Sequence, residues 1–218
     1  MAPQQYYLLS MIAGRKHTSV AKTGSSGVIM VDIKIFPPGS DAEEIYRFRY
    51  RIYEDEMQRH DQYADHETKR ITDPLDAHGY NIAAYDGDTV IGVARVNFCA
   101  DGDPGNYLEF YELDSVSDDY PGKVAFSTRI MVDAAHRGGV LPLQISVECF
   151  KLGLERGVRW CFCDCNAPLK PFFLKLGYEI QNPSKQHQSF GEVTVLRFDL
   201  ADPRHYDRKK SVFARYLK

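Results

Sequence analysis

Residues 124–157 read VAFSTRIMVDAAHRGGVLPLQISVECFKLGLERG, and this stretch decides the fold class. Its first nine residues, 124–132, are rich in apolar and β-branched side chains, which predicts a strand. Apolar residues recur at helical spacing along 141–156, and Gly157 follows as a helix-ending glycine. Between strand and helix, Gly138-Gly139 lets backbone N–H groups approach an anion at a helix N-terminus. A strand, a glycine turn and a helix in this order are typical of an α/β protein.

Working outward, alternating apolar positions and helical spacing predict further elements on both sides of this stretch. The other predicted strands cover 27–36, 80–85, 89–97, 158–165, 178–181 and 192–200, and the other predicted helices cover 41–57 and 166–176. Residues 58–78 are polar and acidic, and Pro74 prevents a long helix there, so we expect a loop with a turn or two of helix. This order predicts a mixed sheet with helices on both faces.

The length of 218 residues suits one domain with short extensions. We expect a flexible N-terminal leader over residues 1–27, the folded domain over 28–201 and a polar, basic tail over 202–218. The tail is interpreted as a solvated end, and the alternative is a docking patch for an acidic carrier protein.

Charge, hydropathy and cysteine content narrow the functional class. The net charge of −3 and the pI of about 6.2 give no electrostatic basis for binding nucleic acid. No stretch approaches the roughly 20 apolar residues that would cross a bilayer. The five cysteines are an odd number without a secretion signal, which indicates a reducing, cytoplasmic setting.

Three of the cysteines, Cys161, Cys163 and Cys165, alternate along the predicted strand 158–165 and therefore share one of its faces. Ligands on one strand splay too far apart for tetrahedral zinc, and no histidine lies alongside them. We therefore expect these thiols to pack in the core rather than to hold a metal.

Two segments resemble the GNAT superfamily of acyltransferases. Residues 137–141, Arg-Gly-Gly-Val-Leu, resemble the donor-binding loop that opens a helix in that superfamily, and residues 166–178 resemble a later segment that ends in Leu-Gly-Tyr. The resemblance implies a GNAT fold, in which a mixed, mostly antiparallel central sheet has helices on both faces. It also implies an enzyme that uses an acyl thioester.

Four segments in the N-terminal and central parts narrow the resemblance. Residues 46–56, 71–76, 90–96 and 127–132 resemble, in the expected order, motifs of the N-acyl amino acid synthase and acyl-homoserine-lactone synthase branch. Members of this branch take fatty acyl groups from acyl carrier protein, or sometimes from coenzyme A. The resemblance therefore implies an acyl-phosphopantetheine thioester as co-substrate and no tightly bound cofactor.

The resemblance also implies a set of donor-binding residues. In this fold the strand that carries Arg129 splays from its neighbour, and its main-chain N–H groups hold the pantetheine and the thioester carbonyl. The implied donor-binding residues are Ile130, Met131, Val132, Arg137, Gly138, Gly139 and Asn166.

The chain departs from the family pattern at three places. Leu141 stands where acetyl-CoA enzymes have a second glycine, and a bulky residue there would obstruct a pyrophosphate, which favours a carrier-protein donor. Ala125 and Phe126 stand where the branch has a glutamate, and Phe173 replaces a general-acid tyrosine. Catalysis is then expected to use other groups or to depend mainly on positioning.

Aminolysis of a thioester needs a neutral amine, donors for the oxyanion and a thiolate that leaves. Asp73 and Asp76 are the leading candidates for the base, with Glu56 next. Asp76 is alternatively a site for a positively charged acceptor, and Asp73 is alternatively a cap before Pro74. The same loop contains two further titratable residues, His66 and Glu67, but nothing beyond their residue type suggests a role for them.

Arg49 and Arg95 lie in apolar or aromatic surroundings, and a buried arginine needs an anionic partner. Asp73 and Asp76 would supply one in a structural ion pair. Alternatively, Arg95 or Arg129 holds an acceptor carboxylate through a bidentate fork. Two strand hydroxyls would either donate to the acyl donor or bond a neighbour; these are Ser127 and Thr128.

Aromatic side chains are frequent, and several lie in or beside the segments that would line an acyl slot: Phe98, Tyr107, Phe110, Tyr111, Phe126 and Phe150. Ordinary core packing explains each of them singly, and together they permit a medium or long chain.

The sequence thus favours an N-acyltransferase that moves a medium- or long-chain fatty acyl group from acyl carrier protein, or from coenzyme A, to an amine. The acceptor would be an amino acid, a polyamine or a peptide side chain. Two alternatives stay open: an acyl-homoserine-lactone synthase, and a non-catalytic GNAT-like module that binds an acyl chain or a partner.

Overall fold

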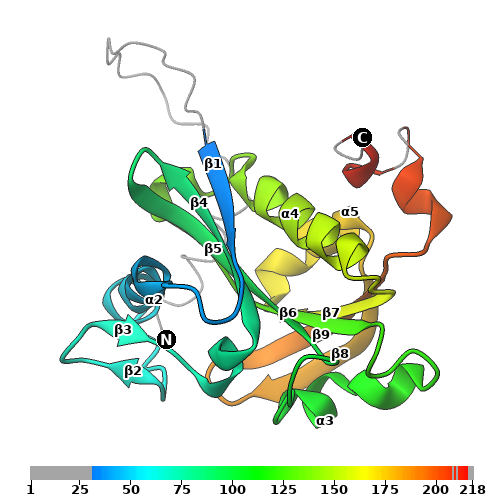
Figure 1. The fold of residues 1–218 in the computed structure, drawn as a ribbon, viewed down its shortest axis with the longest axis horizontal. Helices are drawn as coiled ribbons and strands as arrows, with labels where there is room; N and C mark the ends of the chain where they lie inside the picture. The colour runs from blue at the N-terminus through cyan, green and yellow to red at the C-terminus, as the bar shows by residue number, and fades with distance from the viewer. Residues whose placement is uncertain (1–30, 208, 210, 216–218) are drawn as a thin grey trace.

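The structure is a computed structural model that describes residues 31–207, 209 and 211–215. A seven-stranded sheet in the order β1-β4-β5-β6-β7-β9-β8 forms its centre (Figure 1). The strands are β1 (Val31–Phe36), β4 (Gly79–Asp86), β5 (Thr89–Phe98), β6 (Val124–Val132), β7 (Trp160–Cys165), β8 (Glu179–His187) and β9 (Gly191–Asp199). Neighbouring strands run antiparallel except β6 and β7, which are parallel, so the expected mixed, mostly antiparallel sheet is confirmed.

Helices cover both faces of this sheet, as expected. The helices are α2 (Glu43–Tyr50), α3 (Tyr107–Tyr111), α4 (Leu141–Glu155) and α5 (Lys170–Leu176). Alternate residues of β4 show the two faces: Ile82 and Ala84 belong to the cluster of α4, whereas Ala83 and Tyr85 belong to the cluster of α2. None of the helices in the described part of the chain has the length and hydropathy needed to cross a bilayer.

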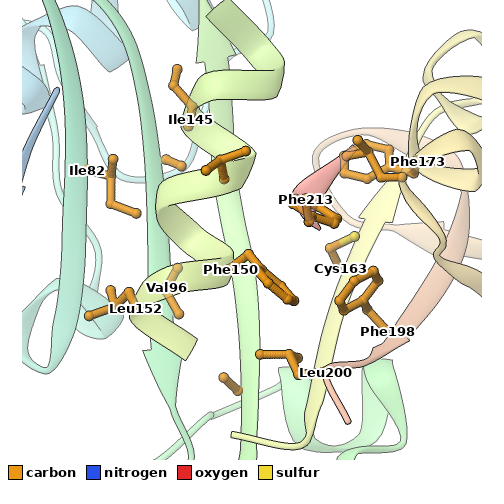
Figure 2. Close-up of a cluster of buried hydrophobic side chains, with 14 of the residues drawn as sticks. Ile82, Val96, Ile145, Phe150, Leu152, Cys163, Phe173, Phe198, Leu200 and Phe213 are labelled. Carbon is orange, nitrogen blue, oxygen red and sulfur yellow. The ribbon is translucent and has the colours of Figure 1, made fainter. Parts of the chain in front are cut away.

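The larger core cluster lies between the sheet, α4 and α5. Phe150 of α4 points toward Phe198 and Phe213, while Ile145 faces Ile82 of the sheet (Figure 2). Gly92 of β5 lies under α4 at a point where an added Cβ would come within 2.7 Å of Ile145 Cδ1, so this glycine permits the close approach of helix and sheet.

The cysteines of β7 occupy this core. Cys163 and Cys165 are buried members of the larger cluster, and Cys161 packs against it, as the alternation along the strand predicts. Burial raises the pKa of all three thiols, so they stay protonated and are poor nucleophiles.

Strands β6 and β7 pair only at their beginnings. The register joins Val124–Phe126 to Trp160–Phe162 and ends there. Beyond that point β6 continues along β5 to Val132, and β7 continues along β9 to Cys165. The β5–β6 pairing contains an irregularity, and Arg129 has a left-handed φ of 58°, a conformation that is rare for a residue with a side chain. Strands β6 and β7 therefore separate after Phe126, and β6 contains this irregularity, a β-bulge at Arg129, along the separated part.

The structure differs from the sequence predictions in four segments. The predicted helix 41–57 consists of α2 and a wider π-helical turn, Arg51–Glu56. The predicted loop 58–78 contains a small hairpin, β2 (Ala64–Asp65) with β3 (Arg70–Ile71), and a 3₁₀ turn at Pro74–Ala77. Strand β8 is much longer than 178–181, because register shifts accommodate Pro183. The short helix α3 was not predicted, since five residues carry too little periodicity.

The solvated interpretation of the C-terminal segment is wrong for part of its described residues, since Arg204 and Lys209 are exposed but others are buried. Phe213 is 2% exposed, and its ring stacks on Phe150 at 4.6 Å. His205 is also buried and stacks on Phe198 at 4.1 Å. Aromatic side chains in a polar segment therefore complete the core beside α4. The expected leader, 1–27, lies outside the described residues.

Candidate functional site

The divergence of β6 and β7 creates a cavity of about 120 Å³. One wall is β6 from Ser127 to Val132, and the other is β7 and the following turn from Cys163 to Asn166. Apolar side chains of α5 and of the β8–β9 loop close it, among them Phe173 and Phe190. This apolar slot, here called the strand-gap cavity, is the kind of space that an acyl chain or a pantetheine arm requires.

A second cavity of about 650 Å³ lies beside the first, here called the loop cavity. Its lining comes from the loops around Asp61, Asp73 and Asp103 and from the end of β8 around His187. Three side chains line both cavities, so the cavities are adjacent at these residues: Tyr107, Arg129 and Phe190. An apolar slot and a polar cavity that share a wall suit a reaction between two substrates.

Three arginines and three aspartates with buried side chains form a network that reaches the loop cavity at Asp61, Asp73 and Arg129. Arg95 Nη1 lies 2.6 Å from Asp73 Oδ1 and 3.1 Å from Asp76 Oδ1. Arg49 Nη1 donates to both oxygens of Asp76, at 3.0 and 2.9 Å, and its Nη2 donates to Asn81 Oδ1 at 2.5 Å. Both arginine side chains are 0% exposed. The ion pair that the sequence left as one alternative for these residues is therefore present.

Arg129 connects this network to the bulge in β6. Its Nη1 donates to Asp61 Oδ2 at 2.5 Å and its Nη2 to Asp73 Oδ2 at 2.8 Å. The guanidinium also lies over the Tyr53 ring, 5.3 Å from its centre. These contacts hold Arg129 in its left-handed conformation and so maintain the separation of β6 from β7.

The network lowers the pKa of two carboxylates, those of Asp73 and Asp76. Burial alone raises the pKa of Asp73, but the charges of Arg95 and Arg129 hold it well below its usual range. Asp76 is affected in the same way by Arg49 and Arg95. Such carboxylates are weak bases, which favours the structural alternative for both residues, and their role as base stays a prediction.

Asp73 also caps the turn that follows it. Its Oδ1 accepts from Leu75 N at 3.0 Å, while Asp76 Oδ2 accepts from Asp73 N at 3.0 Å, which forms a reciprocal capping box around Pro74. The turn fixes both carboxylates toward the arginines. The cap that the sequence offered as an alternative for Asp73 therefore coexists with the ion pairs.

Glu56 and Arg137 form an ion pair with each other on the edge of the site. Arg137 Nε also donates to Val132 O at 2.9 Å, which ties the glycine turn to the end of β6. Neither residue lines a cavity, nor does the Gly138-Gly139 turn, in which Gly138 has a φ of 77°. Their predicted roles in catalysis and donor binding stay predictions.

Leu141 does not obstruct the donor in the way expected from the sequence. Its side chain is 4% exposed and belongs to the core beneath α4, close to Gly92. The leucine therefore does not project toward an incoming pyrophosphate and does not discriminate against coenzyme A.

The remaining residues predicted to bind the donor line the strand-gap cavity: Ile130, Met131, Val132 and Asn166. The two strand hydroxyls whose role the sequence left open, Ser127 and Thr128, line it as well. Thr128 Oγ1 accepts from Arg95 Nε at 3.2 Å, which connects the cavity wall to the charge network. Asn166 Nδ2 donates to Phe190 O and Glu192 O, at 3.1 and 3.2 Å. Asn166 thereby fixes the β8–β9 loop that closes the cavity.

Two site residues were missed by the sequence analysis. Asp164 lines the strand-gap cavity, and His187 lines the loop cavity. For Asp164 a signal existed, because it is the one charged residue within the apolar run of β7. For His187 the sequence offers no signal, since the length of β8 was not apparent.

His187 is held neutral. Burial, together with the charges of Arg129 and Arg59, lowers its pKa from 6.5 to about 4. Its Nδ1 accepts from Ser189 N at 3.1 Å, and its ring stacks on Phe190 at 4.2 Å. In the neutral ring Nε2 therefore carries the proton and can donate into the loop cavity.

This lowered pKa predicts a pH-dependent stability. The unfolded chain binds a proton at His187 near pH 6.5, whereas the folded chain resists it until about pH 4. The His187 contribution to the free energy of unfolding is therefore complete above pH 6.5 and falls as the pH drops toward 4. Urea midpoints across this interval should decline less in His187→Gln than in the wild type. His60→Gln, which removes a side chain that is 85% exposed, should keep the wild-type slope; equal slopes in all three proteins would contradict the prediction.

One protein family matches the chain. The family model described as N-acyl amino acid synthase FeeM covers residues 44–199. This range includes the central sheet from β4 onward and the strands that line the two cavities. A search of curated proteins finds no match.

Solved structures share the fold at low sequence identity. FeeM, an N-acyl amino acid synthase from uncultured soil microbes, superposes with a TM-score of 0.62 at 13% identity, over 87% of this chain and 99% of that one. The acyl-homoserine-lactone synthase LasI gives 0.63 at 13% identity, over 81% and 93%. The CoA-dependent synthase BjaI, solved with SAM and isopentyl-CoA, gives 0.59 at 19% identity, over 73% and 76%.

Proposed function

This chain belongs to the N-acyl amino acid synthase FeeM family of GNAT-type acyltransferases, and from that membership we propose that it transfers a medium- or long-chain fatty acyl group from a phosphopantetheine thioester to an amine. The donor carrier is acyl carrier protein or coenzyme A. The acceptor is an amine of an amino acid, a polyamine or a peptide side chain.

The observation that carries this proposal is the divergence of β6 from β7. Their register ends at Phe126 and Phe162, and the strand-gap cavity begins at the next residue, Ser127. Beyond that point β6 stays paired with β5 on one side, and on its other side it borders the cavity rather than β7. We assign to the backbone around Ile130 and Met131 the contacts with the pantetheine and with the oxygen of the thioester carbonyl.

The acceptor enters from the loop cavity. In its lining Arg129 is balanced by Asp61 and Asp73, and the same network continues away from the cavity through Arg95, Asp76 and Arg49. Since each guanidinium already bonds at least one carboxylate, this wall does not favour a second carboxylate from the acceptor. Asp103 adds a further negative charge to the lining, so the cavity favours an acceptor that is recognised through its ammonium group.

A direct assay tests the proposal. Purified protein is incubated with octanoyl to palmitoyl thioesters, on acyl carrier protein and on coenzyme A, together with pools of amino acids and polyamines. Thiol release that depends on the amine, with an N-acyl product identified by mass spectrometry, is the expected result. Release with S-adenosylmethionine and a lactone product would establish the synthase alternative. Absence of turnover with every donor, despite donor binding, would establish the non-catalytic alternative.

A further inference from the structure

Asp164 occupies a distinctive place in β7. The cysteines on either side of it, Cys163 and Cys165, turn toward the core of α4, so strand alternation turns Asp164 to the opposite face. Asp164 is nevertheless one of the residues that line the strand-gap cavity, as are both cysteines, across from the β6 residues that follow Ser127. An acidic residue is thus placed in the wall of the slot assigned to the thioester.

Tyr111 of α3 fixes this carboxylate. Its hydroxyl donates to Asp164 Oδ1 at 2.6 Å, and its side chain is 0% exposed. The Tyr111 ring stacks on Tyr107 at 5.0 Å, and Tyr107 lines both cavities. The Tyr111 hydrogen bond engages Oδ1 of the carboxylate. The aspartate therefore has a fixed orientation beside the residues shared by the two cavities.

The groups around Asp164 come from three elements. Tyr107 and Tyr111 belong to α3, Tyr53 belongs to the π-helical turn, and Arg59 follows that turn. Burial raises the pKa of Asp164, while the Tyr111 hydrogen bond and the Arg59 charge oppose the rise. The pKa values of Asp73 and Asp76 are lowered instead, because each of these carboxylates has two arginines beside it.

We infer that Asp164 is the catalytic base of the acyl transfer, that it accepts the proton of the acceptor amine and that Tyr111 is its positioning residue. This inference rests on the proposed function. Asp164 lines the strand-gap cavity, is held by the Tyr111 hydroxyl and lies near Tyr107 at the border with the loop cavity. The basicity that burial gives it supports the same role.

Each proton and electron pair of the acyl transfer has a donor and an acceptor. The bound ammonium first loses one proton to solvent. The nitrogen of the resulting neutral amine attacks the thioester carbonyl, the C–N bond forms, and the carbonyl electrons move to the oxygen. The nitrogen then loses one proton to the Asp164 carboxylate. As the carbonyl re-forms, the C–S bond breaks and the thiolate leaves with the electron pair. The protonated Asp164 returns its proton to this thiolate, so that one carboxylate serves both halves of the reaction.

The test compares Asp164→Asn with a matched variant. Asp119→Asn removes a charge from an aspartate that is also buried and also accepts from an aromatic side chain, Trp160 Nε1 at 3.0 Å, but lines neither cavity. Asp164→Asn should lower kcat on the order of 10²-fold, with the donor KM little changed, and should lose the acidic limb of the pH–rate profile. Asp119→Asn should retain the wild-type kcat and the acidic limb of the profile.

Tyr111→Phe separates a positioning role from a merely structural one, and it decides the matter if Asp164→Asn does not fold. Loss of the hydroxyl removes a hydrogen bond to the charged carboxylate, so the pKa of Asp164 rises and the acidic limb should move to higher pH. A purely structural effect would lower kcat without moving that limb, and this result would overturn the inference.

The outcomes also separate this inference from the function on which it rests. If wild-type protein transfers no acyl group to any amine, the proposed function fails and the inference fails with it. If wild-type protein transfers acyl groups and Asp164→Asn does so at the wild-type rate with an unchanged pH profile, the inference alone is overturned.

Discussion

Arg95→Met should be the most destabilising single change in the site, with a loss of about 3–5 kcal/mol in the free energy of unfolding. The substitution keeps the apolar stem and removes a guanidinium that is 0% exposed. Asp73 and Asp76 then lose the partner that they share, and Thr128 Oγ1 loses its donor. A buried charge that is deprived of its partner keeps its desolvation cost without compensation.

Urea denaturation, with the slope fixed by the wild type, measures this loss. Arg47→Met is the matched control, because Arg47 pairs with Glu43 at 2.8 Å while its side chain is 64% exposed. Exposed pairs of this kind contribute about 0.3–0.5 kcal/mol. Adding Asp73→Asn to Arg95→Met should recover part of the stability, since one stranded charge is removed. A loss near that of Arg47→Met would show that the network does not hold the site together.

Ile130→Trp should block acyl transfer while the protein stays folded. Ile130 lies in the wall of a cavity of about 120 Å³, and an indole at that position fills much of this space. Excluding about five methylenes of a fatty acyl chain, at about 0.8 kcal/mol each, costs about 4 kcal/mol of binding. This corresponds to a decrease on the order of 10³-fold in kcat/KM for a long-chain donor.

Steady-state kinetics with a palmitoyl donor measure the effect, and urea denaturation checks the fold. Val140→Trp is the control, because Val140 is 67% exposed just before α4 and does not line the cavity. Ile130→Val should remain near the wild type. If Ile130→Trp kept its activity within a few-fold of Val140→Trp, the acyl chain would not occupy the strand-gap cavity.

The elements that the sequence predicted well are those with strong local patterns. Strand β6 lies at 124–132, as its run of apolar and β-branched residues predicts, and α4 differs from the prediction 141–156 by one residue. The elements that it missed have weak local signals. α3 spans five residues, and β8 contains Pro183 together with many polar side chains. Their conformations depend on neighbours that are distant in sequence.

The site shows the same division. The sequence singled out Arg49, Arg95 and Asp76 by their types and surroundings, but it left the pairing and the roles open. The structure joins residues that are 27 positions apart in the Arg49–Asp76 pair. It also places Asp164 against Tyr111, which lies 53 positions away. Type and spacing carry no information about such contacts, since they follow from the order of strands in the sheet.

The sequence by itself determined the family, the run of strands and helices and the chemical types available for catalysis, because periodicity, glycines and motif spacing act over a few residues. Only the tertiary structure decided where β6 leaves β7, which carboxylates the arginines neutralise and which one faces the donor slot. These features depend on how strands from distant parts of the chain pair and bury charge, and the free energy of that burial depends on the assembled fold.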